Sequence, residues 1–184
     1  EISCSLVGSE MCIRDSFGVG ERLVTSKSEP VFGGVYKLAA VERNGKIVPK
    51  IKISENTEKI TNPGYKEVWR LFDNSTGMAI ADVITLAGEV IDNTKPYTIF
   101  NPEQTYKRKI ITDFTPKKLQ VKIVEKGRCI YNMLPIDEIK EYCSQQLSYI
   151  WDEVKRFENP HQYYVDLSEN LWELKKSMLD EYYK

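Results

Sequence analysis

Residues 35–53 read VYKLAAVERNGKIVPKIKI, and this stretch decides the fold class of the middle of the chain. Two apolar, β-branched runs, 35–41 and 47–53, lie on either side of the dipeptide Asn44-Gly45. Asn-Gly between such runs favours a type I′ turn, because both central residues of that turn need a positive φ. The stretch therefore predicts a β-hairpin.

Strand patterns continue toward the C-terminus. Apolar and β-branched residues predict strands over 67–72 and 78–86, separated by a polar turn. Residues 119–125 and 128–133 alternate around Lys126-Gly127, which predicts a second hairpin. The middle of the chain is therefore predicted to be rich in antiparallel β-structure.

Helical periodicity replaces this pattern after Pro135. Apolar residues recur every three or four positions over 136–157, which is typical of one face of an amphipathic helix, and Asn159-Pro160 is predicted to end it. A last helix is predicted to begin at or just before Ser168. Strands followed by helices indicate an α+β fold.

A glycine-rich segment near the N-terminus is the main candidate for a binding site. Residues 17–25 read FGVGERLVT, in which Gly18 and Gly20 lie on either side of Val19 just before a possible helix. Glycines allow close backbone approach to a ligand, and the amide groups of a helix N-terminus bind phosphate well. From this pattern alone, a phosphate-binding loop and a plain tight turn both stay open.

Four segments in order resemble nicotinate phosphoribosyltransferases. The first is the GVG loop, and the second is FGGVYKL over 32–38. The third begins with KISE at 52–55, continues as EKITNPGYK over 58–66 and ends at Arg70. The fourth is NPHQYYVDLS over 159–168. The resemblance covers residues 17–174 and identifies the chain as similar to the C-terminal part of that family.

This resemblance implies a division of the chain and a set of site residues. Residues 17–34 would form the end of a phosphoribosyltransferase α/β barrel, 35–133 the β-rich part and 134–184 the helical part. By the same resemblance, the substrate phosphate-binding residues would hold the 5′-phosphate of the ribosyl group through their backbone amides; they are Gly18, Val19, Gly20 and Glu21. Family members often have threonine where Glu21 stands. Because a carboxylate beside a phosphate is unfavourable, we expect the Glu21 side chain to turn away and only its N–H to contribute.

The resemblance also implies a reaction. The full-length enzyme would join nicotinate to phosphoribosyl pyrophosphate, giving nicotinate mononucleotide and pyrophosphate in NAD salvage, with ATP hydrolysis and Mg²⁺. The phosphorylated histidine, the nicotinate pocket and the pyrophosphate-binding arginines would lie upstream of the GVG loop. We therefore expect no catalytic residue, cofactor or activity in this chain alone, and a possible homodimer in the parent enzyme. Two alternatives are a non-enzymatic partner-binding module and part of a nicotinamide phosphoribosyltransferase.

Residues 1–16 differ from the rest of the sequence. They include SLVGSEMCIRDS over 5–16, which resembles a translated sequencing-adapter string and has no counterpart in the family. The segment also lacks the positive start and unbroken apolar core of a signal peptide. We expect a disordered, non-native leader.

The composition of the chain indicates which kinds of partner to expect and in which cellular compartment. Without residues 1–16, the chain carries 25 basic and 24 acidic residues, so charge gives no reason to expect nucleic acid binding. No apolar run is long enough to span a bilayer. Cys129 and Cys143 are widely separated and His161 is the single histidine, so we expect no metal site. Two free thiols favour the cytoplasm.

Five residues stay open between a binding role and a structural one. Arg70 is able to reach a phosphate, although an arginine in a strand is more often an inter-strand or surface partner. His161 matches the NPHxY segment, where a structural role in a turn is favoured. The lysines Lys37, Lys52 and Lys66 are similarly undecided.

Overall fold

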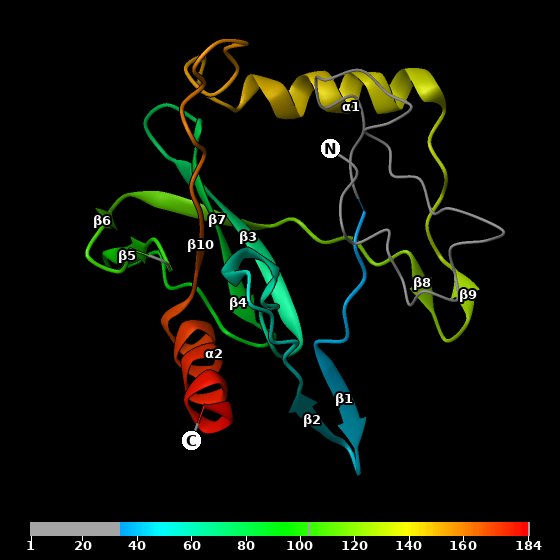
Figure 1. Ribbon diagram of the computed structural model, residues 1–184. Coiled ribbons are helices and arrows are strands. Elements are labelled where there is room, and N and C mark those ends of the chain that lie inside the picture. Colours follow the sequence, from blue (N-terminus) through cyan, green and yellow to red (C-terminus); the bar gives the residue numbers. More distant parts are fainter. Residues whose placement is uncertain (1–33, 103, 184) are drawn as a thin grey trace, which may run out of the picture. The chain divides into compact units, whose positions relative to one another are not determined.

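The computed structural model describes residues 34–102 and 104–183, drawn in colour in Figure 1. The chain divides into two units, Glu1–Tyr36 and Lys37–Lys184, and the description below concerns the second. The predicted leader, the GVG loop and all but the last residue of the predicted barrel end (17–34) lie outside the described residues.

A four-stranded sheet in the order β10-β4-β3-β7 is the centre of this unit (Figure 1). Strands β3 (Lys66–Asp73) and β4 (Ala79–Leu86) form its long antiparallel pair, as the sequence predicts. Strand β7 (Phe114–Lys118) pairs with β3 antiparallel, and β10 (Val165–Leu167) pairs with β4 parallel. Pro116 fits this arrangement, because β7 is an edge strand and proline donates no ladder hydrogen bond.

The apolar core lies against this sheet. Strand β4 reads AIADVITL and most of its residues are buried, because it has a neighbouring strand on each side. Strands β5 (Tyr97–Phe100) and β6 (Arg108–Ile111) form a separate hairpin that contributes Ile99 and Ile111 to the core. The core cluster consists of Leu71, Ile80, Ala81, Val83, Ile91, Ile99, Ile111 and Phe114.

Both predicted tight hairpins are confirmed. Strands β1 (Ala40–Arg43) and β2 (Lys46–Pro49) meet at Asn44 and Gly45, whose φ angles are 53° and 73°. Strands β8 (Val124–Glu125) and β9 (Arg128–Cys129) meet at Lys126 and Gly127, with φ angles of 48° and 75°. These strands are shorter than predicted. A short 3₁₀ turn, Thr57–Lys59, lies in the loop before β3.

The first helix, α1 (Ile136–Ser148), ends earlier than the predicted residue 157. The carbonyl oxygen of Tyr149 accepts a hydrogen bond from the backbone N–H of Ala79 in β4, at 2.9 Å. The Tyr149 ring also contacts Phe72 edge-on, with 5.4 Å between centroids. In a longer helix, the Tyr149 carbonyl would accept a hydrogen bond from an N–H four residues later. Here it accepts from the sheet, so the helix ends and two tight turns follow.

The second helix, α2 (Glu169–Tyr182), begins where the sequence predicts. Ser168 is its N-cap, and its hydroxyl oxygen accepts a hydrogen bond from the N–H of Leu171 at 3.3 Å. The same hydroxyl donates to the carboxylate of Glu89, 2.9 Å away, and Asn170 donates to the other oxygen of that carboxylate. Glu89 thus fastens the start of α2 to the turn after β4.

The α+β class is confirmed, and the sequence pattern missed four strands. Strand β10 has three residues and pairs with a strand some eighty positions earlier, so no turn signal accompanies it. Strands β5, β6 and β7 are also short, at four or five residues each. Neither helix of the described residues is long and apolar enough to cross a membrane.

Candidate functional site

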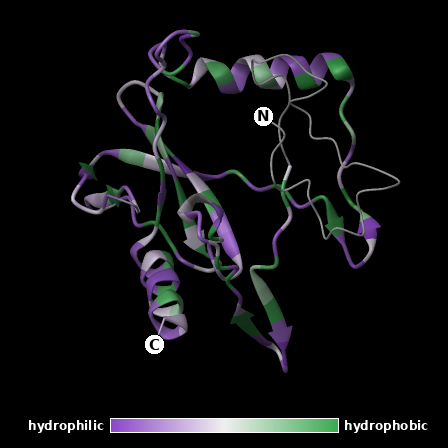
Figure 2. Cartoon of the chain, viewed as in Figure 1, coloured by the Kyte–Doolittle hydropathy of each residue, from purple (hydrophilic) through white to green (hydrophobic). Residues whose placement is uncertain are grey.

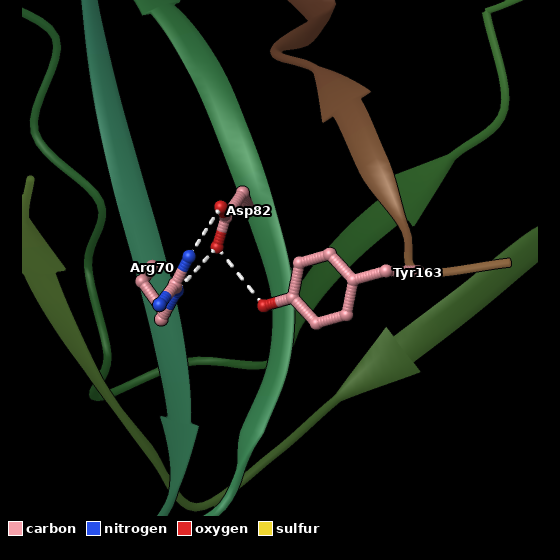
Figure 3. A network of polar contacts seen from close by, with 3 residues as sticks. All are labelled: Arg70, Asp82 and Tyr163. Atoms are coloured by element: carbon pink, nitrogen blue, oxygen red, sulfur yellow. Dashed lines mark hydrogen bonds and ion pairs between the residues drawn. The ribbon is translucent and has the colours of Figure 1, made fainter. Parts of the chain in front are cut away.

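Arg70, Asp82 and Tyr163 form a hydrogen-bonded network across the central sheet (Figure 3). Arg70 in β3 faces Asp82 in β4 directly in the strand register. Its Nε–H and one Nη–H donate to the two carboxylate oxygens of Asp82, at 2.8 and 3.0 Å. The Tyr163 hydroxyl donates to Asp82 Oδ1 at 2.9 Å, and the guanidinium carbon lies 5.8 Å from the centre of its ring.

Hydrogen bonding, burial and charge shift the pKa values of two of these groups, Arg70 and Tyr163. The Arg70 and Asp82 side chains are 15% and 12% exposed, so this is a mostly buried, two-point ion pair. The hydrogen bond to Asp82 raises the pKa of Arg70 above its ordinary value. Burial, and then the charge of Asp82, raises the pKa of the Tyr163 hydroxyl strongly, so it stays a donor. Arg70 is thus an inter-strand partner, which was the structural alternative in the sequence analysis.

A cavity of about 630 Å³ lies beside this network. It is lined by the start of β4, the β5–β6 hairpin and the segment from Trp151 to Asp166, so residues 161–166 of the NPHQYYVDLS motif line it. Tyr163 belongs to both the network and the cavity wall. The ion pair therefore positions the segment that carries this motif.

Asp166 is the buried acid of the cavity wall. It lies in the middle of β10 opposite Val83, and it is only 3% exposed. Within the described residues its carboxylate has no hydrogen bond or ion pair. Burial alone raises its pKa to about 6. The sequence analysis missed this residue, although an acid between Val165 and Leu167 in a short apolar run was an available signal.

His161 has a structural backbone role and an exposed ring. Its N–H donates to the carbonyl of Glu153 at 2.9 Å, which closes the loop between α1 and β10. This contact agrees with the turn role that the sequence favours, and the residue also lines the cavity.

The PGYK segment is held by Lys66 and Gly64. The Lys66 ammonium donates to the carbonyls of Asn62 and Gly64, at 2.8 and 2.6 Å, and burial lowers its pKa. Gly64 has a φ of 90° and lies against the side chain of Leu86. Lys66 is therefore a structural residue. Lys37 is exposed, and Lys52 bonds through its backbone N–H to the Thr61 hydroxyl, at 2.8 Å.

The predicted phosphate-binding residues, Gly18, Val19, Gly20 and Glu21, lie outside the described residues. Nothing in the structure tests that prediction. Among the described residues, no group of three or more His, Cys, Asp or Glu side chains is placed to hold a metal ion.

These features define a small α+β domain whose β-sheet carries a mostly buried ion pair beside a cavity. Residues 65–175 match the family model described as nicotinate phosphoribosyltransferase C-terminal domain, and the chain belongs to that family.

Curated relatives carry the same name. The chain is 41% identical to nicotinate phosphoribosyltransferase of Bacillus subtilis over 167 residues, which cover 91% of this chain and 34% of the relative. It is 34% identical to that of Dictyostelium discoideum, covering 86% of this chain and 28% of the relative. The chain therefore spans about a third of the length of these relatives.

A solved structure has the same fold. The crystal structure of human nicotinic acid phosphoribosyltransferase matches with a TM-score of 0.60 and 24% sequence identity, over 73% of this chain and 26% of that one. This match supports the α+β arrangement described above.

The ionisation of Asp166 leads to a prediction about stability. An ordinary aspartate has a pKa near 3.9, and burial raises that of Asp166 to about 6. The neutral form therefore favours folding below pH 4, and this advantage is lost as the pH rises from about 4 to 6. Relative to Asp166→Asn, the wild-type chain should lose about 1–3 kcal/mol between pH 4.5 and 7.5.

Urea unfolding of both proteins at the two pH values measures this difference, and the exposed Asp180→Asn is the matched control. Parallel pH dependence of wild type and Asp166→Asn would contradict the burial of an unpaired carboxyl group.

Proposed function

We propose that this chain is the C-terminal part of a cytoplasmic enzyme that forms nicotinate mononucleotide from nicotinate and phosphoribosyl pyrophosphate, with ATP hydrolysis. The observation that carries the proposal is the family match over residues 65–175. The identity to the Bacillus subtilis relative over 91% of the chain supports it. Because the relatives carry the name of the nicotinate enzyme, nicotinamide is the less favoured substrate.

In this enzyme, the proposed contribution of the chain to substrate binding is the loop Gly18–Glu21. Its backbone N–H groups would donate to the 5′-phosphate of phosphoribosyl pyrophosphate, while other groups position the pyridine ring. ATP and Mg²⁺ would be held by the upstream part of the enzyme. No metal-binding cluster is present among the described residues, and we assign no step of the reaction to a metal there.

Exposed apolar side chains support the view that this domain works within a larger protein. Helix α1 buries none of its residues, although several of them are apolar. Ile136, Ile139 and Leu147 are 64%, 44% and 51% exposed. Green hydrophobic positions alternate with purple hydrophilic ones along α1 in Figure 2. Further exposed apolar residues precede the helix, at Val121, Val124, Ile130 and Met133. An apolar surface of this kind typically contacts another protein surface.

A chimera tests the proposal. Residues 17–184 would replace the matching C-terminal region of the Bacillus subtilis relative, and formation of nicotinate mononucleotide would be assayed with nicotinate, phosphoribosyl pyrophosphate and ATP. We expect turnover by the chimera and none by the 184-residue chain alone, because positioned groups supply many orders of magnitude of rate. A folded but inactive chimera, or turnover by the chain alone, would contradict the proposal.

The same chimera tests the phosphate loop. Gly20→Val places a branched side chain where phosphate oxygens are expected, and a lost hydrogen bond to a charged group weakens binding roughly tenfold or more. Calorimetry should show this loss for phosphoribosyl pyrophosphate and little change for nicotinate. Gly34→Val is the control, since a Cβ at Gly34 meets no atom within 4 Å. Equal affinity of wild type and Gly20→Val for the sugar pyrophosphate would make the loop a plain turn.

A further inference from the structure

The cavity beside β10 is lined by side chains of both charges. On one side is Asp166, which is 97% buried and has no hydrogen-bond or ion-pair partner in the part of the chain described. A buried carboxylate without a donor is costly, and most buried polar groups in proteins have a partner. The cavity that Asp166 lines is the place from which water or a ligand can donate a hydrogen bond to it.

The other polar part of the cavity wall is basic. Lys107, just before β6, and Arg108 and Lys109, its first two residues, line the cavity. Because adjacent residues of a strand point to opposite faces, Lys107 and Lys109 lie on one face, whereas the Arg108 guanidinium lies 5.3 Å from the centre of the Phe100 ring. None forms an ion pair with a carboxylate among residues 34–102 and 104–183. Arg108 donates its Nε–H to the carbonyl of Thr105, at 3.0 Å, and lies over Phe100, so its guanidinium is held within its own hairpin. The ammonium groups of Lys107 and Lys109 are the cations available to a ligand in the cavity.

Asp166 also forms no ion pair with these three basic residues. The carboxylate and the cations therefore line the same cavity, about 630 Å³ in volume, without contacting one another. A bare anion would satisfy the cations and leave Asp166 unpaired, whereas an amine would do the reverse. A ligand that satisfies both needs an anionic group at one position and an O–H or N–H donor at another.

Aromatic side chains complete the wall. Trp151 and Tyr106 line the cavity and are 41% and 78% exposed. The ammonium group of Lys109 lies 5.8 Å from the centre of the Trp151 ring, so a cation is already held over an aromatic surface there. Such surfaces accept the flat faces of sugars and bases.

We propose that this cavity binds a phosphorylated sugar, either free or as the sugar phosphate of a nucleotide. The phosphate group contacts Lys107 and Lys109, and a sugar hydroxyl donates a hydrogen bond to the carboxylate of Asp166. The network of Arg70, Asp82 and Tyr163 fixes the adjoining wall. The site uses none of residues 18–21, and it stands whether or not the parent enzyme forms nicotinate mononucleotide.

Calorimetric titration of the purified 184-residue chain tests the site with four probes: inorganic phosphate, ribose, ribose 5-phosphate and AMP. Ribose 5-phosphate should bind more tightly than phosphate or ribose, because it engages both ends of the cavity. Tighter binding of AMP assigns the site to nucleotides, and equal binding assigns it to sugar phosphates. No binding of either phosphorylated probe at millimolar concentration would overturn the proposal.

Single substitutions test which side chains of the cavity contact the ligand. Asp166→Asn and Lys107→Gln should each weaken ribose 5-phosphate binding by roughly tenfold, since each removes a charged hydrogen-bond partner. Asp166→Asn should weaken inorganic phosphate binding far less than Lys107→Gln does. Lys95→Gln is the matched control, because Lys95 pairs with Asp92 and does not line the cavity.

Circular dichroism confirms that each variant folds. Unchanged affinity in folded Asp166→Asn and Lys107→Gln, or equally tight binding of phosphate alone, would overturn the proposal.

Discussion

Asp82→Ala should lower the free energy of unfolding of the chain by about 3 kcal/mol, because it leaves a mostly buried guanidinium without its carboxylate. Arg70 donates two hydrogen bonds to Asp82, and the Tyr163 hydroxyl donates a third. The substitution therefore leaves three donors unpaired in a region where the pair is only 15% and 12% exposed. Urea unfolding followed by tryptophan fluorescence measures the change.

A solvent-exposed ion pair is the matched control. Lys122 pairs with Glu125, and the two side chains are 64% and 50% exposed. Lys122→Ala should therefore cost less than about 1 kcal/mol. A similar cost for Asp82→Ala and Lys122→Ala would mean that the Arg70–Asp82 pair contributes no more than a solvated one.

Two further variants separate the charge from the packing. Tyr163→Phe removes one hydrogen bond to a charged group and should cost about 1.5–3 kcal/mol. Arg70→Met combined with Asp82→Leu removes both charges and should restore much of the stability that Asp82→Ala loses. If the double variant is less stable than Asp82→Ala, apolar packing does not substitute for the pair at this position.

The parts of the fold that sequence predicts correctly are those encoded locally. Asn44-Gly45 and Lys126-Gly127 have the positive φ angles that tight hairpin turns need, so both hairpins follow from a few residues. Ser168 likewise caps α2 with its own side chain. These features depend on neighbours in the sequence, which a single chain reveals.

The parts that sequence does not predict depend on distant contacts. The C-terminus of α1 is set by the hydrogen bond between Tyr149 and Ala79, some seventy positions apart. Strand β10 exists because it pairs with β4, and it brings Asp166 to the cavity wall. The acids of β4 and β10, Asp82 and Asp166, stand in apolar runs. That signal marks them as unusual, but it does not distinguish a paired acid from an unpaired one.

Family resemblance and structure contribute different parts of the candidate site. The GVG loop was found from sequence and stays a prediction, because residues 18–21 lie outside the described part of the chain. The NPHQYYVDLS segment was found as a motif, and the structure adds that four functions meet in it. His161 closes a loop, Tyr163 joins the ion pair, Asp166 lines the cavity and Ser168 caps α2.

Gly64→Ala should lower the free energy of unfolding by about 2–3 kcal/mol, through strain at a positive φ and through overpacking. Gly64 has a φ of 90°, and a Cβ there would lie 2.7 Å from Cδ2 of Leu86. Its N–H also donates to the carbonyl of Ala39 at 2.7 Å, and its carbonyl accepts from Lys66. These contacts restrict the movement that would relieve the clash.

Gly88→Ala separates backbone strain from overpacking as causes of destabilisation. Gly88 has nearly the same φ, 89°, but a Cβ there meets no atom within 4 Å. It should therefore show the backbone strain alone, about 1–2 kcal/mol. Urea unfolding of both variants gives the packing contribution as the difference. Equal destabilisation would mean that the Leu86 side chain moves aside freely, and that the glycine of the PGYK segment is needed for its backbone conformation rather than for close packing.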